Sequence, residues 1–83
     1  MRYRYKLTLE QTNMLQNCEP CWPKVFKYAK LMEEGVEFPA VNIYFDSLNN
    51  IWKYNDGRHR VMAAKMANVG LYVKSSRIMG ENL

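Results

Sequence analysis

The amino-acid sequence predicts a small α+β domain with about four strands and two to three helices. Hydrophobic alternation at residues 2–9 and 39–55 is typical of strands, whereas residues 23–34 and 57–68 repeat their apolar positions with a helical period. A length of 83 residues fits one domain, so residues 1–83 are expected to form a single unit. The composition, 48% hydrophobic and 24% charged, is that of a globular protein rather than a disordered chain.

The first elements are a strand and two helices. Aromatic and aliphatic residues alternate with basic ones over residues 2–9, which predicts a half-buried strand with one basic face. Thr8-Leu9-Glu10-Gln11 then fits a capping box, which opens a short helix that reaches about Asn17. Two prolines within residues 18–23 predict a loop or helix entry, and the next helix begins at Pro23 and stops at Gly35.

The second half of the chain predicts a hairpin, a helix and a strand. Residues 39–46 and 51–55 are the two strands of the hairpin, with turn residues between them. Asp56 is the expected N-cap of a buried helix from Gly57 to Asn68, which Gly70 ends. A last strand starts at Leu71, and residues 79–83 are expected to form a frayed tail.

Composition also bears on location and partners. No segment approaches the roughly 20 apolar residues of a membrane helix, and no secretory signal pattern is present, so a cytoplasmic protein with no membrane partner is expected. Cys18 and Cys21 are then expected to be reduced thiols. The net charge of +4 permits an anionic partner but does not choose between a nucleotide and a nucleic acid.

Basic side chains fill the first turn of the predicted helix 57–68, where the helix dipole disfavours cations. They are Arg58, His59 and Arg60. Free N–H groups at a helix start, together with arginine side chains, bind phosphate, and Gly57 lets a ligand approach the backbone. Alternatively, Asp56 pairs with Arg58 or Arg60 and the cluster simply faces water.

The segment Asp56-Gly57-Arg58-His59-Arg60-Val61-Met62-Ala63-Ala64-Lys65 follows the predicted hairpin, and a helix–glycine–proline stretch from Leu31 to Pro39 precedes it. This pattern resembles the signature box of the ParB/sulfiredoxin superfamily, and the similarity covers about residues 24–73. The resemblance implies a ParB/sulfiredoxin-like fold whose box holds the phosphates of ATP or CTP, with Mg²⁺. It also implies that Gly57 is the close-approach glycine and that His59 and Arg60 contact phosphate.

Differences between this sequence and the family pattern exclude two of the family's functions from the prediction. Arg58 stands where sulfiredoxins carry their catalytic cysteine, so reduction of cysteine sulfinic acid is not expected. The chain lacks the helix-turn-helix domain of partitioning proteins, so site-specific centromere binding is not expected. The predicted function is nucleotide-phosphate binding through residues 57–60 by a stand-alone ParB-like domain, associated with a phage or plasmid. The alternative is a non-catalytic nucleic-acid-binding or DNA-partitioning accessory protein.

Catalysis is left open. Nuclease chemistry has no paired carboxylates to support it, whereas phosphoryl transfer is the reaction class to expect if the protein is an enzyme. In that case His59 and Asp56 are the candidate catalytic groups. Asp56, Lys53 and Glu10 are candidate supporting residues for nucleotide binding.

Two further patterns have competing interpretations. Cys18-x-x-Cys21 is half a zinc site or a redox pair, but His59 is the only conventional partner, so no metal is predicted. Arg2, Arg4 and Lys6 form a basic strand face that fits a nucleic-acid backbone, but the favoured interpretation is the solvated face of an edge strand. An exposed strand edge of this kind also permits a homodimer.

Overall fold

The computed structural model describes residues 2–80 and follows the element order that the sequence predicts. Its elements are β1 (Tyr3–Lys6), α1 (Leu9–Asn13), α2 (Trp22–Glu33), β2 (Val41–Asp46), β3 (Ile51–Tyr54), α3 (Arg58–Ala67) and β4 (Tyr72–Ser75). The α+β class is therefore confirmed. The first strand and the first helix are each shorter than predicted, because Thr8 caps α1 and the helix ends at Asn13.

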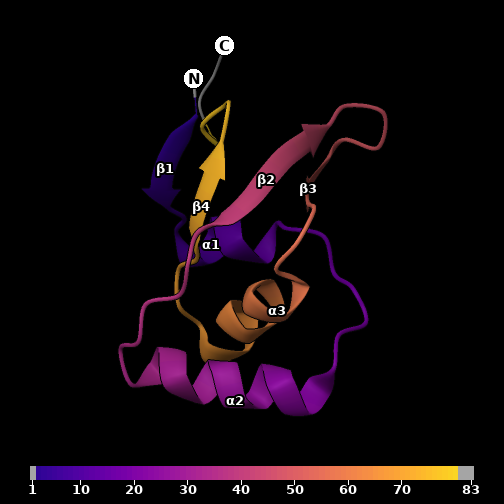
Figure 1. Ribbon diagram of the computed structural model, residues 1–83. Coiled ribbons are helices and arrows are strands. Elements are labelled where there is room, and N and C mark those ends of the chain that lie inside the picture. The colour runs from indigo at the N-terminus through magenta and orange to yellow at the C-terminus, as the bar shows by residue number, and fades with distance from the viewer. Residues whose placement is uncertain (1, 81–83) are drawn as a thin grey trace.

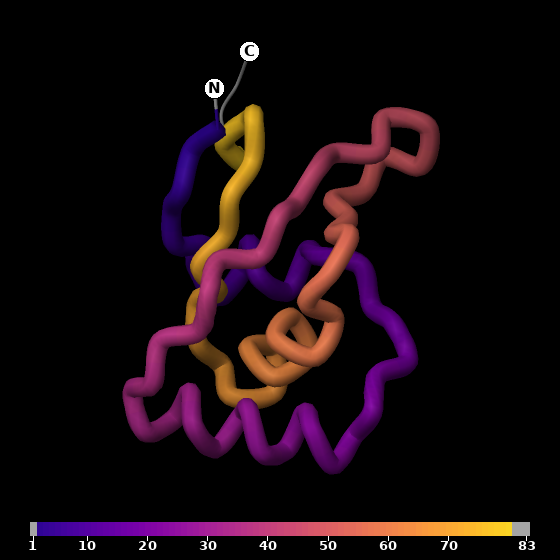
Figure 2. Tube along the Cα trace, in the orientation of Figure 1, coloured from indigo at the N-terminus to yellow at the C-terminus, as the bar shows by residue number. Residues whose placement is uncertain are grey.

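The four strands form one sheet in the order β1-β4-β2-β3. β4 pairs antiparallel with β1 and parallel with β2, and β2 and β3 form the predicted hairpin. The first and last strands are therefore neighbours, although Tyr3 and its partner Ser75 lie at opposite ends of the sequence. Figure 2 shows the indigo and yellow ends of the chain side by side.

The core lies between the sheet and α3, and α2 forms the outer layer beyond α3 (Figure 1). One face of the sheet contributes fully buried aliphatic side chains, among them Val41, Ile43 and Val73. α3 adds three buried residues to the core, namely Val61 and the small residues Ala63 and Ala64, and small residues allow neighbouring backbones to pack closely. Within residues 2–80, no helix is long and apolar enough to cross a lipid bilayer.

The start of α3 differs from the sequence expectation. Gly57, not Asp56, is the N-cap residue, and its backbone is left-handed with φ 100°. Asp56 turns its side chain back instead, so that its Oδ1 accepts a hydrogen bond from the Gly57 N–H at 2.9 Å. The Asp56 cap prediction is wrong because the left-handed turn at Gly57 separates that carboxylate from the later N–H groups of the helix.

The end of α3 also differs. Asn68, in the left-handed conformation with φ 55°, ends the helix, and the next N–H, from Val69, returns to the Ala64 carbonyl. Gly70 has another role, since any side chain there would collide with the Leu7 carbonyl oxygen. A glycine is needed at this position for the close passage of two backbones rather than for stopping the helix.

The predicted frayed tail is wrong at Met79. This side chain is 3% exposed, and its backbone N–H donates to the Tyr5 hydroxyl at 2.9 Å. Its carbonyl accepts from the Gln11 side-chain amide at 3.2 Å. The chain is held in place as far as Met79, and residues 81–83 lie outside the described part.

Candidate functional site

The start of α3 is built around a position that only glycine can occupy. At Gly57, a Cβ would lie 2.9 Å from Val41 Cγ2 and 2.9 Å from Arg60 Nη2, in a backbone conformation that other residues rarely adopt. The first helical bond runs from the Val61 N–H to the Gly57 carbonyl at 2.9 Å. No side chain in residues 2–80 caps the earlier N–H groups, so they remain available to an acceptor.

The N-terminus of α2 lies next to the N-terminus of α3. The Cys21 N–H, at the N-cap of α2, donates to His59 Nε2 in the first turn of α3 at 3.0 Å. α2 likewise has no side-chain cap among the described residues. Because each helix N-terminus carries a partial positive charge, their meeting creates a region of positive potential.

An open depression of about 320 Å³ lies at this meeting point, hereafter the α2–α3 depression. Its lining consists of Lys24, Asn55, Asp56, Gly57, Arg58 and His59. The lining thus contains two permanent cations, Lys24 and Arg58, with one histidine and one acid, Asp56. The structure therefore brings together Asp56 and the predicted site residues Gly57, Arg58 and His59.

Lys24 and Asn55 were not identified by sequence reasoning. Lys24 has the helical spacing of Lys27 and Lys30, and the sequence predicts a solvated face for all three. Only the packing of α2 against α3 distinguishes Lys24, since it lies in the first turn of α2, next to the start of α3. The linear signal that could have found it is its place directly after the Pro23 helix entry.

His59 is held as a neutral side chain. Its Nε2 accepts the Cys21 N–H, so the ring proton of the neutral form lies on Nδ1. Burial, then the charges of Lys24 and Arg58, lower the pKa of His59 from its ordinary value of 6.5, and Asp56 opposes this effect. With Nε2 engaged, His59 is better arranged to donate from Nδ1 than to act as a base.

Arg60 does not line the α2–α3 depression. Its guanidinium passes over Gly57, and Nη1 donates to the Pro39 carbonyl at 2.7 Å. The side chain thereby joins the start of α3 to the segment that enters β2. Arg60 therefore has a structural role next to the depression, because it links the start of α3 to Pro39.

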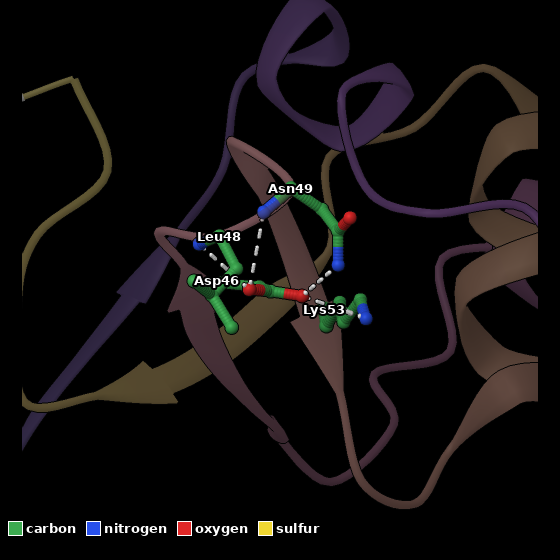
Figure 3. Close-up of polar contacts among 4 residues, drawn as sticks. All are labelled: Asp46, Leu48, Asn49 and Lys53. Carbon is green, nitrogen blue, oxygen red and sulfur yellow. Dashed lines mark hydrogen bonds and ion pairs between the residues drawn. The ribbon is translucent and has the colours of Figure 1, made fainter.

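Lys53 and Glu10, the other candidate supporting residues, lie elsewhere. Lys53 forms an ion pair with Asp46 at the β2–β3 hairpin (Figure 3), and its Nζ lies 2.8 Å from Asp46 Oδ2. Asp46 also accepts hydrogen bonds from the turn residues Leu48 and Asn49. Lys53 first, and then Asn49, hold the pKa of the Asp46 carboxyl well below its usual range. Glu10 is exposed in the first turn of α1 and is not part of the depression.

The two cysteines are free thiols in different surroundings. Cys21 is exposed at the α2 N-cap, whereas Cys18 is half-buried with its Sγ 3.2 Å from the Tyr54 hydroxyl. Burial and the hydrogen bond with Cys18 raise the pKa of Tyr54. Across residues 2–80, no three histidine, cysteine or acidic side chains gather as a group that could hold a metal ion.

The basic strand face lies away from the α2–α3 depression. β1 is an edge strand of the sheet, as the solvated-edge interpretation of Arg2, Arg4 and Lys6 requires, and all three side chains are exposed.

No family model, curated protein or solved structure matches the chain. The ParB/sulfiredoxin resemblance of residues 24–73 thus stays a prediction from the sequence.

Proposed function

We propose that the protein binds the phosphate groups of a nucleoside di- or triphosphate in the α2–α3 depression. The observation that carries the proposal is the meeting of two helix N-termini, linked by the Cys21–His59 hydrogen bond, beside the cations Lys24 and Arg58. Uncapped helix N–H groups and positive side chains are the donors that phosphate oxygens prefer. The resemblance of residues 24–73 to the ParB/sulfiredoxin box supports the same ligand class, with ATP or CTP as the first candidates.

Each residue of the depression has a role in this proposal. The first-turn N–H groups of α3 donate to phosphate oxygens, and Gly57 leaves the approach to them open. Lys24 and Arg58 neutralise the negative charge, and His59 donates from Nδ1. Asp56 is the one acid of the lining and the candidate contact for a Mg²⁺ ion that arrives with the nucleotide. The proposed setting is the cytoplasm, in a ParB-like domain of phage or plasmid association.

Thermal unfolding with ATP, CTP, GTP and their diphosphates, with and without Mg²⁺, tests the proposal. A nucleotide at about 100 times its dissociation constant adds about 2.7 kcal/mol, which raises the midpoint of this small domain by on the order of 10 °C. The double variant Lys24→Gln/Arg58→Gln should lose this shift. Lys27→Gln/Lys30→Gln is the matched control, because it removes the same charge from exposed positions of α2.

The single histidine supplies a second readout. Bound phosphate should raise the pKa of His59, which NMR can follow without ambiguity of assignment. Absence of a thermal shift with every nucleotide, or equal effects of the two double variants, would overturn the proposal. A shift with a DNA duplex alone would instead favour the nucleic-acid-binding alternative, and its loss in Lys24→Gln/Arg58→Gln would assign the depression to backbone phosphates.

A further inference from the structure

The face of the sheet turned away from α3 carries a cluster of cations and tyrosines. Strand pairing places Arg4 opposite Lys74 and Lys6 opposite Tyr72, while on the other side of β4 Asn42 is the partner of Lys74. Tyr44 and Lys53 continue the same face onto the hairpin. We name this surface the outer sheet face, and it consists of Arg4, Lys6, Asn42, Tyr44, Lys53, Tyr72 and Lys74, together with the exposed Arg2, which lies two residues before Arg4.

Most of its positive charge is not neutralised. In the part of the chain that the structure describes, the one ion pair is Lys53 with Asp46, at the hairpin end. Arg4 and Lys6 lie over the Tyr72 ring, with their charged groups 4.8 and 5.5 Å from its centre. The acid at the other margin, Glu37, accepts a hydrogen bond from the Tyr72 hydroxyl at 3.4 Å rather than pairing with a cation.

The pairing of Arg4 with Lys74 works against stability. Like charges directly opposite each other on neighbouring strands repel and destabilise a sheet. Both side chains are exposed, so the pair contributes nothing to the core. An anion that lay across both strands would relieve this repulsion.

The outer sheet face also offers an exposed aromatic ring and borders a hollow. Tyr44 is 43% exposed on the outer sheet face. At the opposite margin, Lys6 and Tyr72 also line an open hollow of about 160 Å³ whose wall includes Phe38 and Val69. Stacking on aromatic rings is how flat protein surfaces hold unpaired bases, whereas bases in a duplex are not accessible to them.

We propose that the outer sheet face binds single-stranded nucleic acid. Arg2, Arg4, Lys6 and Lys74 contact the phosphates, and Tyr44 stacks on a base. This site shares no residue with the α2–α3 depression, so it stands or falls independently of nucleotide binding there.

Fluorescence anisotropy with labelled T12 and U12 oligonucleotides tests the proposal, and the two arms distinguish DNA from RNA. Four phosphate contacts predict a slope of log affinity against log salt of about −2.8, since each contact to a single strand contributes about 0.7. Lys6→Gln/Lys74→Gln should reduce the slope by about 1.4 and weaken binding by on the order of tenfold or more at 50 mM salt. Tyr44→Ala should weaken binding by roughly fivefold or more and leave the slope unchanged, because it removes stacking and no charge.

Two controls separate this surface from general positive charge and from the other site. Lys27→Gln/Lys30→Gln removes the same charge from α2 and should leave the affinity and the slope unchanged. Lys24→Gln/Arg58→Gln, which changes only the α2–α3 depression, should also bind the oligonucleotides normally. Circular dichroism establishes that each variant is folded.

Three results would overturn the proposal. The first is that Lys6→Gln/Lys74→Gln and Lys27→Gln/Lys30→Gln weaken oligonucleotide binding equally. The second is tighter binding of a 12-base-pair duplex than of either single strand. The third is binding to phosphatidylserine vesicles with none to either oligonucleotide, which would assign the face to an anionic lipid surface.

Discussion

Two separate features of the structure require glycine at position 57, namely its backbone conformation and the lack of space for a side chain. Its φ of 100° is a conformation that favours glycine, and the space beside it is filled by Val41 and Arg60. Gly35 has a similar φ of 91°, but nothing lies within 4 Å of where a Cβ would be. A comparison of substitutions at Gly57 and Gly35 therefore separates the effect of backbone strain from that of steric contact.

Gly57→Ala should lower the free energy of unfolding by about 3 kcal/mol, because strain and a clash with Val41 act together. Gly35→Ala should lower it by about 1 kcal/mol, from strain alone. Urea denaturation of the two variants measures the difference. Equal losses would mean that the surroundings of Gly57 yield freely and that only its φ matters.

At the level of elements, the site depends on how the starts of α2 and α3 are held together. The hydrogen bond from the Cys21 N–H needs an unprotonated Nε2 on His59. Burial, and then the charges of Lys24 and Arg58, hold the pKa of His59 below 6.5. Protonation of His59 would also remove the acceptor of the Cys21 N–H. The contact between the two helices is thus sensitive to pH.

Stability should fall as the pH drops from 7.5 to 5.5. With the pKa lowered in the folded state, the unfolded chain binds the proton more readily, so the stabilisation is complete above about pH 6.5 and is lost as the pH falls through the folded-state value. Thermal unfolding at several pH values measures this loss. Since His59 is the only histidine, His59→Ala should flatten the profile over this range, and an unchanged profile would contradict the assignment.

The sequence predicts the elements well and the site in part. Periodicity and turn residues identify the seven elements, because each is a local pattern that the tertiary structure leaves in place. The roles of Lys24 and Arg60 were not predictable, since one depends on the packing of α2 against α3 and the other on the path of the chain at Pro39. Local sequence patterns cannot distinguish Lys24, which lies next to the start of α3, from the solvent-exposed Lys27 and Lys30 of the same helix.

At the scale of the whole molecule, Tyr5 joins segments that are distant in the sequence. Its hydroxyl lies 2.9 Å from Ser75 Oγ and 3.2 Å from the Arg77 carbonyl, and it accepts the Met79 N–H. Together with the β1–β4 pairing, these contacts hold the last described residues against the first strand.

Tyr5→Phe should lower the free energy of unfolding by about 1–3 kcal/mol, because it leaves the Met79 N–H without its acceptor. The expected fall in the melting temperature is roughly 4–8 °C for each kcal/mol. Tyr3→Phe is the matched control, since Tyr3 is 42% exposed in the same strand. A similar effect of both substitutions in thermal unfolding would show that the Tyr5 hydroxyl contributes nothing specific.

The β1–β4 pairing also has a consequence for synthesis. Among the strands of this sheet, β1 leaves the ribosome first, but its partner β4 follows only after Tyr72 has been made. At about 5–20 residues per second, β1 waits several seconds with both of its edges unpaired, the interval in which a nascent strand is most exposed to wrong partners. Like charges at Arg2, Arg4 and Lys6 disfavour pairing of this segment with the same segment of a neighbouring chain, which lowers the risk of wrong pairing during that time.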